Sequence, residues 1–143
     1  MPLPQPHPGL VIGYSYLWRA EHLRGEEGGR KDRPCAIIAV RQIVEDKVLV
    51  MVFPVTHTAP KNSDDGVEIP LALKKHLGLD DARSWVAVSE VNQFIWPGPD
   101  LRPVAGKTDR FDYGVVPPGF LRKLQEAFFA RLQKRSLSVV QRT

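Results

Sequence analysis

The chain has 143 residues, 43% of them hydrophobic and 25% charged, and its 20 Lys and Arg against 16 Asp and Glu give a net charge of +4. These values suit one soluble globular domain and exclude collagen-like and strongly disordered chains. The single cysteine, Cys35, excludes an intrachain disulfide and a zinc site built on paired cysteines. The basic excess modestly favours an anionic partner.

Residues 1–8 are expected to form a flexible, proline-rich tail. Their prolines prevent a helix, and the segment lacks the basic and apolar regions of a signal peptide. No apolar stretch approaches the roughly 18 residues that a membrane span requires. We therefore expect a cytoplasmic protein without a membrane partner.

The first strand is predicted over residues 10–18, because apolar side chains recur at every second position from Leu10 to Tyr16. Residues 19–33 then carry three glycines and nine charged residues. This composition predicts a mobile polar loop, and long loops in compact domains are usually functional or disordered.

Two β-rich runs follow and predict an antiparallel hairpin. The first run begins at Pro34 and extends to about Val44, and the second covers residues 48–53 and ends at Thr56 to Thr58. The short polar turn between them would bring the start of one strand and the end of the other to the same edge of the sheet.

The C-terminal half contains one long helix and several short elements. Apolar residues spaced three and four apart from Leu121 to Leu132 predict a helix over residues 120–134 that packs on the sheet. The other expected elements are a strand at 67–70, a short helix at 71–79, a strand at 85–96, an irregular segment at 97–112, a strand at 113–116 and a flexible tail at 136–143. Together these elements predict a mainly β domain over residues 9–135, a small bent barrel with a C-terminal α-helix and a short helix between strands.

Arg33 is the leading candidate for a functional residue. The buried strand fixes its backbone, and a guanidinium offers a planar fork of donors to a phosphate. The hairpin register places Thr56 and His57 near it, so that a hydroxyl can share the phosphate and a histidine can transfer a proton. The alternative for all three residues is ordinary surface chemistry at the end of a strand.

Carboxylates are the other candidates for acid–base chemistry. Glu27 lies in the glycine-rich loop and can swing toward Arg33, or it is simply a solvated loop residue. Glu90 and Asn92 share one face of a strand, where they face solvent or line a site. The sequence has no phosphate-binding loop, dinucleotide motif or metal-ligand spacing, so we expect no metal and no cofactor.

The order of several short motifs resembles the PemK/MazF family of toxins from type II toxin–antitoxin systems. The similarity covers residues 9–134 and rests on Gly9-Leu10-Val11, a glycine and glutamate loop before Arg33-Pro34, Phe53-Pro54-Val55-Thr56, Ser89-Glu90-Val91-Asn92 with Trp96, and Gly114-Val115-Val116-Pro117 before the C-terminal helix.

This resemblance implies an SH3-like barrel, usually a homodimer, that cleaves single-stranded RNA without a metal and is inhibited by a cognate antitoxin. In such a toxin Arg33 would stabilise the transition state and Thr56 would bind the scissile phosphate. A carboxylate would accept the proton of the attacking ribose 2′-OH, leaving a 2′,3′-cyclic phosphate and a 5′-OH. Glu27, His57 and Glu90 remain alternatives for this base.

The remaining residues expected to bind RNA are Arg30, Lys31, Thr58, Asn92 and Phe94. An aromatic ring such as Phe94 can stack on an unpaired base, or it can pack in the core or a dimer interface. The alternative function is a non-catalytic SH3-like module, a degenerate toxin that binds nucleic acid or protein.

Overall fold

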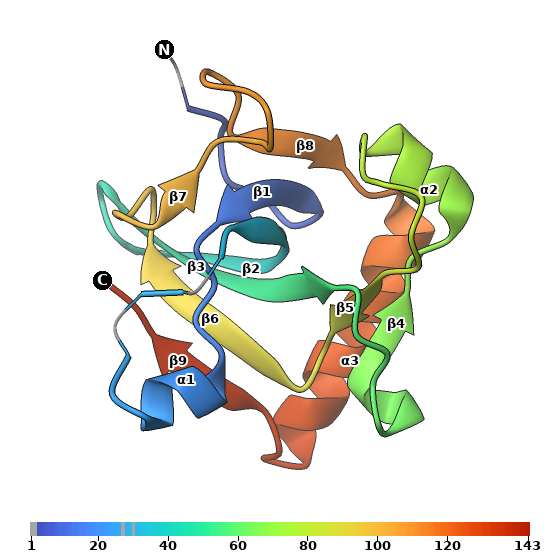
Figure 1. The fold of residues 1–143 in the computed structure, drawn as a ribbon. Helices are drawn as coiled ribbons and strands as arrows, with labels where there is room; N and C mark the ends of the chain where they lie inside the picture. Colours follow the sequence, from blue (N-terminus) through green and yellow to red (C-terminus); the bar gives the residue numbers. More distant parts are fainter. Residues whose placement is uncertain (1–2, 27, 30) are drawn as a thin grey trace.

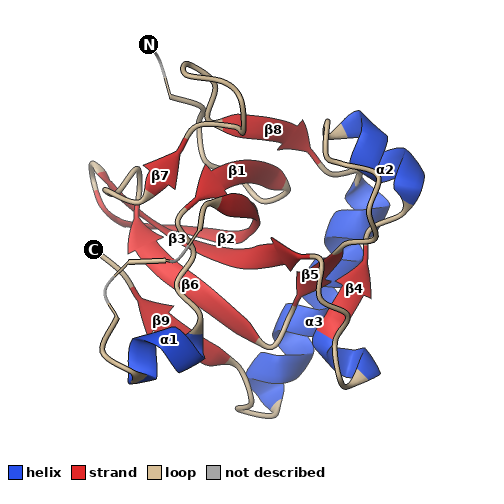
Figure 2. Cartoon of the chain, viewed as in Figure 1, coloured by secondary structure: helices blue, strands red, loops and turns tan. Residues whose placement is uncertain are grey.

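The computed structural model describes residues 3–26, 28–29 and 31–143, which form a strongly curved nine-stranded sheet with three α-helices (Figures 1 and 2). The elements are β1 (Leu10–Tyr14), α1 (Arg19–Leu23), β2 (Arg33–Val44), β3 (Lys47–Thr56), the 3₁₀ turn η1 (Ser63–Asp65), β4 (Gly66–Glu68), α2 (Leu71–His76), β5 (Trp85–Ala87), β6 (Glu90–Ile95), β7 (Leu101–Arg102), β8 (Asp112–Val115), α3 (Pro118–Gln133) and β9 (Ser138–Gln141). The predictions of a mainly β fold, a short helix between strands and a C-terminal helix are confirmed.

The predicted hairpin is present as β2 and β3, at the centre of the sheet. Cys35 pairs with Pro54, and continuing this antiparallel register by two residues places Arg33 opposite Thr56. Two register shifts in β2 add residues to that strand and bend it. The hairpin therefore fixes the backbones of Arg33 and Thr56 side by side at its open end, opposite the turn.

The other strands add to both sides of this hairpin. β1 pairs with β2, and β7 and β8 pair with different stretches of the opposite edge of β1. β5 and β6 pair with different stretches of β3, and β4 extends the sheet from β5. β9 pairs with β6 in parallel, whereas the other pairs are antiparallel.

Alternating side chains of the central strands enter two separate cores. On one face, α3 packs Phe120, Leu124 and Phe128 against the sheet, slightly rotated from the predicted apolar stripe, since Leu132 is 45% exposed. The other face encloses an aromatic cluster that includes Tyr14. Cys35 belongs to that second core and is fully buried, as expected of a small hydrophobic residue.

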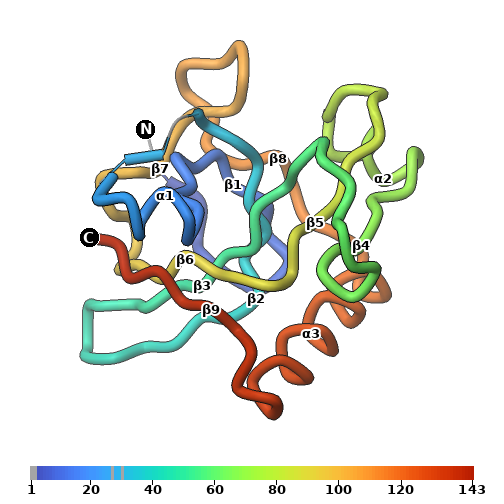
Figure 3. The backbone as a smooth tube through the Cα atoms, turned by 60° about the horizontal axis from the view of Figure 1, so that its bottom comes forward, coloured from blue at the N-terminus to red at the C-terminus, as the bar shows by residue number. Residues whose placement is uncertain are grey.

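Four elements of the structure were not predicted: α1 in the expected loop, η1, β7 in the expected irregular segment, and β9. Residues 136–143 were expected to be a flexible tail, but Ser138–Gln141 form a strand in which Val140 is only 2% exposed. α1 lies beside β9 in both views of the chain (Figures 1 and 3). Among the described helices, none is long and apolar enough to cross a membrane.

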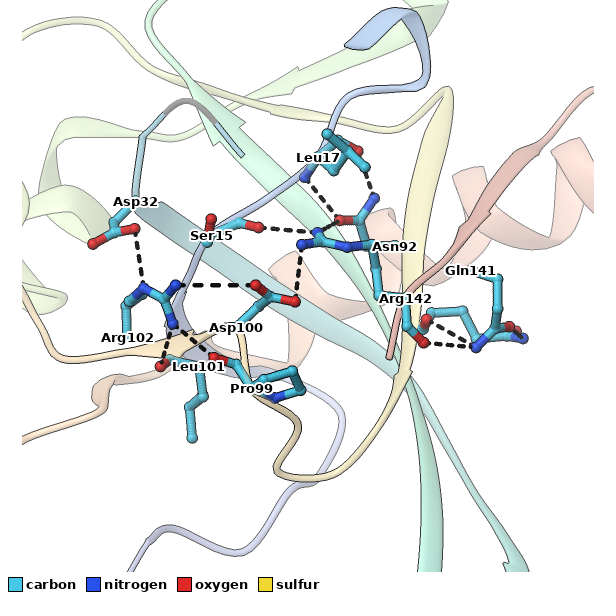
Figure 4. A network of polar contacts seen from close by, with 11 residues as sticks. Ser15, Leu17, Asp32, Asn92, Pro99, Asp100, Leu101, Arg102, Gln141 and Arg142 are labelled. Carbon is cyan, nitrogen blue, oxygen red and sulfur yellow. Dashed lines mark hydrogen bonds and ion pairs between the residues drawn. The ribbon is translucent and has the colours of Figure 1, made fainter. Parts of the chain in front are cut away.

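Backbone pairing does not close the described sheet, but a network of polar side chains connects its two ends (Figure 4). Arg142, directly after β9, donates to the Ser15 carbonyl at 2.9 Å and pairs with Asp100 at 2.9 Å. It also donates to Asn92 Oδ1 at 2.7 Å, and the Asn92 amide bonds both the backbone N–H and the carbonyl of Leu17. The C-terminal segment is therefore part of the folded domain.

Candidate functional site

A groove of about 460 Å³ lies at the edge where β2 begins and β3 ends, and a second cavity of about 300 Å³ adjoins it. Lys31, Arg33, Thr56 and His57 line both of them. The expectation that Thr56 and His57 lie near Arg33 is therefore confirmed. Thr58 lines the larger groove, together with residues that the sequence did not single out: Trp18, Lys61 and Trp85.

The Arg33 guanidinium is held in place by two contacts, neither of them with a carboxylate. Its carbon Cζ lies 5.1 Å from the centre of the Trp18 ring, a cation–π distance. Nη1 donates to the Val55 carbonyl at 3.2 Å, whereas the buried Nε has no hydrogen-bond partner among the described residues. No described carboxylate forms an ion pair with this guanidinium, so it can pair with an anionic ligand in the groove.

Further donors and positive charges surround this guanidinium. Thr56 Oγ1 accepts from the Thr58 backbone N–H at 3.1 Å and keeps its own proton to donate. Lys31 and Lys61 are exposed along the same groove. Asp65, the acidic residue of this lining, is occupied by an ion pair with Arg131. The groove is therefore suited to an anionic ligand.

His57 forms part of a chain of charged groups that leads into the protein. Its Nε2 lies 2.8 Å from Asp80 Oδ2, and Asp80 Oδ1 accepts from Lys74 Nζ at 2.6 Å. The Lys74 side chain is only 2% exposed, and it also donates to Ser84 Oγ at 2.7 Å and to the Ala82 carbonyl. The hydrogen bond from Lys74, together with the nearby His57, holds the pKa of Asp80 below its usual value.

Among the described residues of the predicted site, Glu90, Asn92 and Phe94 do not line the groove. Glu90 Oε1 accepts from the Arg19 backbone N–H at 2.8 Å and from the Tyr16 hydroxyl at 3.2 Å, so this carboxylate caps the first residue of α1. Its burial raises its pKa. The structure does not place Glu90 on the wall of either cavity described above.

The expectation that Asn92 and Phe94 bind RNA is wrong for this structure, because both are fully buried. The polar groups of Asn92 are used in the network that joins the ends of the sheet, and Phe94 stacks on Tyr14 with ring centres 4.5 Å apart. Glu27 and Arg30, the other two loop residues expected in the site, lie outside the described residues.

The sequence carried partial signals for the groove residues that were missed. Trp18 and Trp85 are aromatic residues where a predicted strand meets a polar loop, a position that exposes part of the ring. Asp80 and Lys74 gave no such signal, since their role depends on contacts made only after folding. The described residues contain no cluster of His, Cys, Asp and Glu able to hold a metal ion.

Comparison with known proteins adds no assignment. A scan against models of protein families finds no match, and a search of curated proteins finds no significant match.

Proposed function

We propose that this protein is an endoribonuclease that cleaves single-stranded RNA in the groove around Arg33. The observation that carries the proposal is the half-buried guanidinium, without an ionic partner among the described residues, at the junction of two cavities that also contain Thr56 and His57. A phosphate matches the planar donors of arginine, and the hydroxyl adds a further donor. Lys31 and Lys61 supply charge for neighbouring phosphates.

The proposed reaction is attack of the ribose 2′-OH on the adjacent phosphorus. A base removes the proton from the 2′-OH, the new O–P bond forms, and the bond to the 5′-oxygen breaks as that oxygen takes up a proton. The products are a 2′,3′-cyclic phosphate and a 5′-OH. Arg33 and Thr56 stabilise the charge that develops on the phosphoryl oxygens. DNA is not a substrate, because it has no 2′-OH.

The proposed fold family is the SH3-like barrel of the PemK/MazF type, supported by the strongly curved sheet, the central hairpin and the C-terminal helix. From the same resemblance we propose a homodimer and inhibition by a cognate antitoxin. Exposed apolar side chains of α3, Phe129 and Leu132, are consistent with a covering partner.

The test is incubation of the purified protein with a long single-stranded RNA in EDTA, with DNA of the same sequence in parallel. We expect discrete RNA fragments ending in cyclic phosphate, intact DNA, and a rate reduced about 100-fold or more by Arg33→Ala. Lys47→Ala, at the far end of β3, is the control and should cleave normally. Intact RNA at high protein concentration would overturn the proposal, and so would unchanged cleavage by Arg33→Ala.

The second candidate is a non-catalytic module that binds single-stranded RNA in the same groove. It is favoured by the fact that Glu90 is occupied by Arg19 and Tyr16, and that no described carboxylate contacts Arg33. This candidate predicts RNA binding that depends on Arg33 without any cleavage. RNA with 2′-O-methyl groups, which cannot be cleaved by this reaction, would then bind like unmodified RNA, and the unmodified RNA would stay intact.

A further inference from the structure

We infer that His57 is the proton-transfer residue of the groove, and that Asp80 and the buried Lys74 are positioning residues that hold its ring. This inference rests on the proposed function and selects among the three alternatives for the base. It follows from the chain of contacts that runs from α2 to the wall shared by both cavities.

The contact with Asp80 determines which nitrogen of His57 can act as a base. Because the pKa of Asp80 is held low, its carboxylate is ionised and can only accept hydrogen bonds. Nε2, 2.8 Å away, must therefore carry the proton. In the neutral ring this leaves the lone pair on Nδ1, which can accept the proton of a 2′-OH bound beside Arg33.

Lys74 explains why the Asp80 carboxylate is fixed in this orientation. Burial of an ammonium group is costly unless each of its donors finds a partner. Lys74 meets this requirement with three acceptors, from Asp80, Ala82 and Ser84, all in the loop that follows α2. Since Oδ1 of Asp80 is bound by Lys74, Oδ2 faces His57.

The other titratable groups that line the two cavities are engaged elsewhere or have the wrong chemistry. Lys31, Arg33 and Lys61 are cations, Asp32 pairs with Arg102 at 3.5 Å, and Asp65 pairs with Arg131. In the second cavity, both oxygens of Asp80 are bound, by Lys74 and by His57. Tyr113 accepts from the Ala105 backbone N–H at 3.5 Å, and burial raises the pKa of its hydroxyl, so it keeps its proton and is not a base. Glu90 lines neither cavity. His57 is thus the described residue with both a neutral base form and a position beside the guanidinium.

In the proposed step, Nδ1 of neutral His57 takes the proton of the 2′-OH as the O–P bond forms. The resulting imidazolium, still hydrogen-bonded to Asp80, returns a proton to the departing 5′-oxygen as the P–O5′ bond breaks. The enzyme ends in its initial protonation state, and the reaction needs no water.

The test combines cleavage kinetics with nuclear magnetic resonance of the imidazole nitrogens. We expect His57→Gln to lower the single-turnover rate about 100-fold or more, and added imidazole to restore part of the rate of His57→Gly. Asp80→Asn and Lys74→Met should lower the rate about 10-fold with little change in RNA affinity. The matched controls are His76→Gln and Lys75→Met, which change exposed residues of α2 next to Lys74.

The spectra report positioning independently of cleavage. In the wild type we expect the His57 ring to carry its proton on Nε2, and in Asp80→Asn we expect a mixture of both tautomers. An unchanged tautomer in Asp80→Asn would overturn the positioning role, and this variant remains informative if Lys74→Met fails to fold. Normal cleavage by His57→Gln alongside loss in Arg33→Ala would overturn the proton-transfer role and leave the proposed function standing. Intact RNA with the wild type would overturn the proposed function and this role together.

Discussion

At the residue scale, Asn92 connects parts of the chain that are far apart in sequence. Its amide bonds both backbone groups of Leu17 and accepts from Arg142. Asn92 is fully buried, and Leu17 and Arg142 are only 2% and 6% exposed. Asn92→Ala removes these partners and leaves buried polar groups unsatisfied, at about 1–3 kcal/mol each. We expect the free energy of unfolding to fall by about 3 kcal/mol or more, measured by urea denaturation. Gln42→Ala, an exposed control, should change it by less than about 0.5 kcal/mol; equal effects would refute the structural role of Asn92.

Glu90 gives a prediction about pH. Because burial raises its pKa in the folded protein, the folded state binds more protons than the unfolded state above the ordinary glutamate value of 4.5. Stability from this group is therefore present at low pH and is lost as the pH rises through the raised pKa. Glu90→Gln retains an acceptor for Arg19 and Tyr16 but cannot ionise. We expect its stability relative to the wild type to increase as the pH rises above about 4.5. A difference that is constant with pH in thermal or urea unfolding would contradict this expectation.

The residues of the site differ in how well the sequence could place them. Arg33 and Thr56 were predictable because a short turn joins their strands, so their register follows from local counting. His57 and Asp80 are in contact, but η1, β4 and α2 separate them along the chain. No periodicity encodes such a contact, and a lysine in a helix gives no sign that it will be buried. Asn92 and Phe94 were misplaced because alternation alone does not show that both faces of β6 are covered, although Val91 and Asn92, on opposite faces, are both fully buried.

At the element scale, β9 is a strand that the local sequence pattern could not predict. It is a short edge strand, and its partner β6 lies far away in sequence and runs parallel to it. Such a pairing depends on the whole fold rather than on a turn. α1 is similar, because this helix of five residues is capped from outside by Glu90 and would be marginal alone.

The docking of β9 can be tested with two adjacent valines. Val140 is 2% exposed and Val139 is 48% exposed, so the two side chains report on opposite faces of the same strand. Val140→Ala should lower the free energy of unfolding by about 1–3 kcal/mol, since it removes buried methyl groups. Val139→Ala should change it by less than about 0.5 kcal/mol. Urea denaturation of both variants measures the difference, and equal small effects would show that the C-terminal segment is not packed on β6.

At the scale of the whole molecule, the net charge of +4 matters through its distribution. Lys31, Arg33 and Lys61 line one groove, and the described acidic residues of this groove and of the adjoining cavity are paired with other arginines or with Lys74. Lys47 is also exposed but lies at the opposite end of β3. A bound RNA strand should therefore release counterions at the groove and not at the hairpin tip.

This arrangement predicts how salt affects RNA binding. With an uncleavable 2′-O-methyl RNA, affinity should fall linearly with the logarithm of salt concentration, and each phosphate contact contributes about −0.7 to the slope for a single strand. The double variant Lys31→Ala with Lys61→Ala should make the slope less steep by about 1.4, because two such contacts are lost. Lys47→Ala should leave the slope unchanged, because its charge lies away from the groove. Fluorescence anisotropy at several salt concentrations measures these slopes. A slope that responds to Lys47→Ala, but not to the double variant, would place the RNA on another face of the molecule.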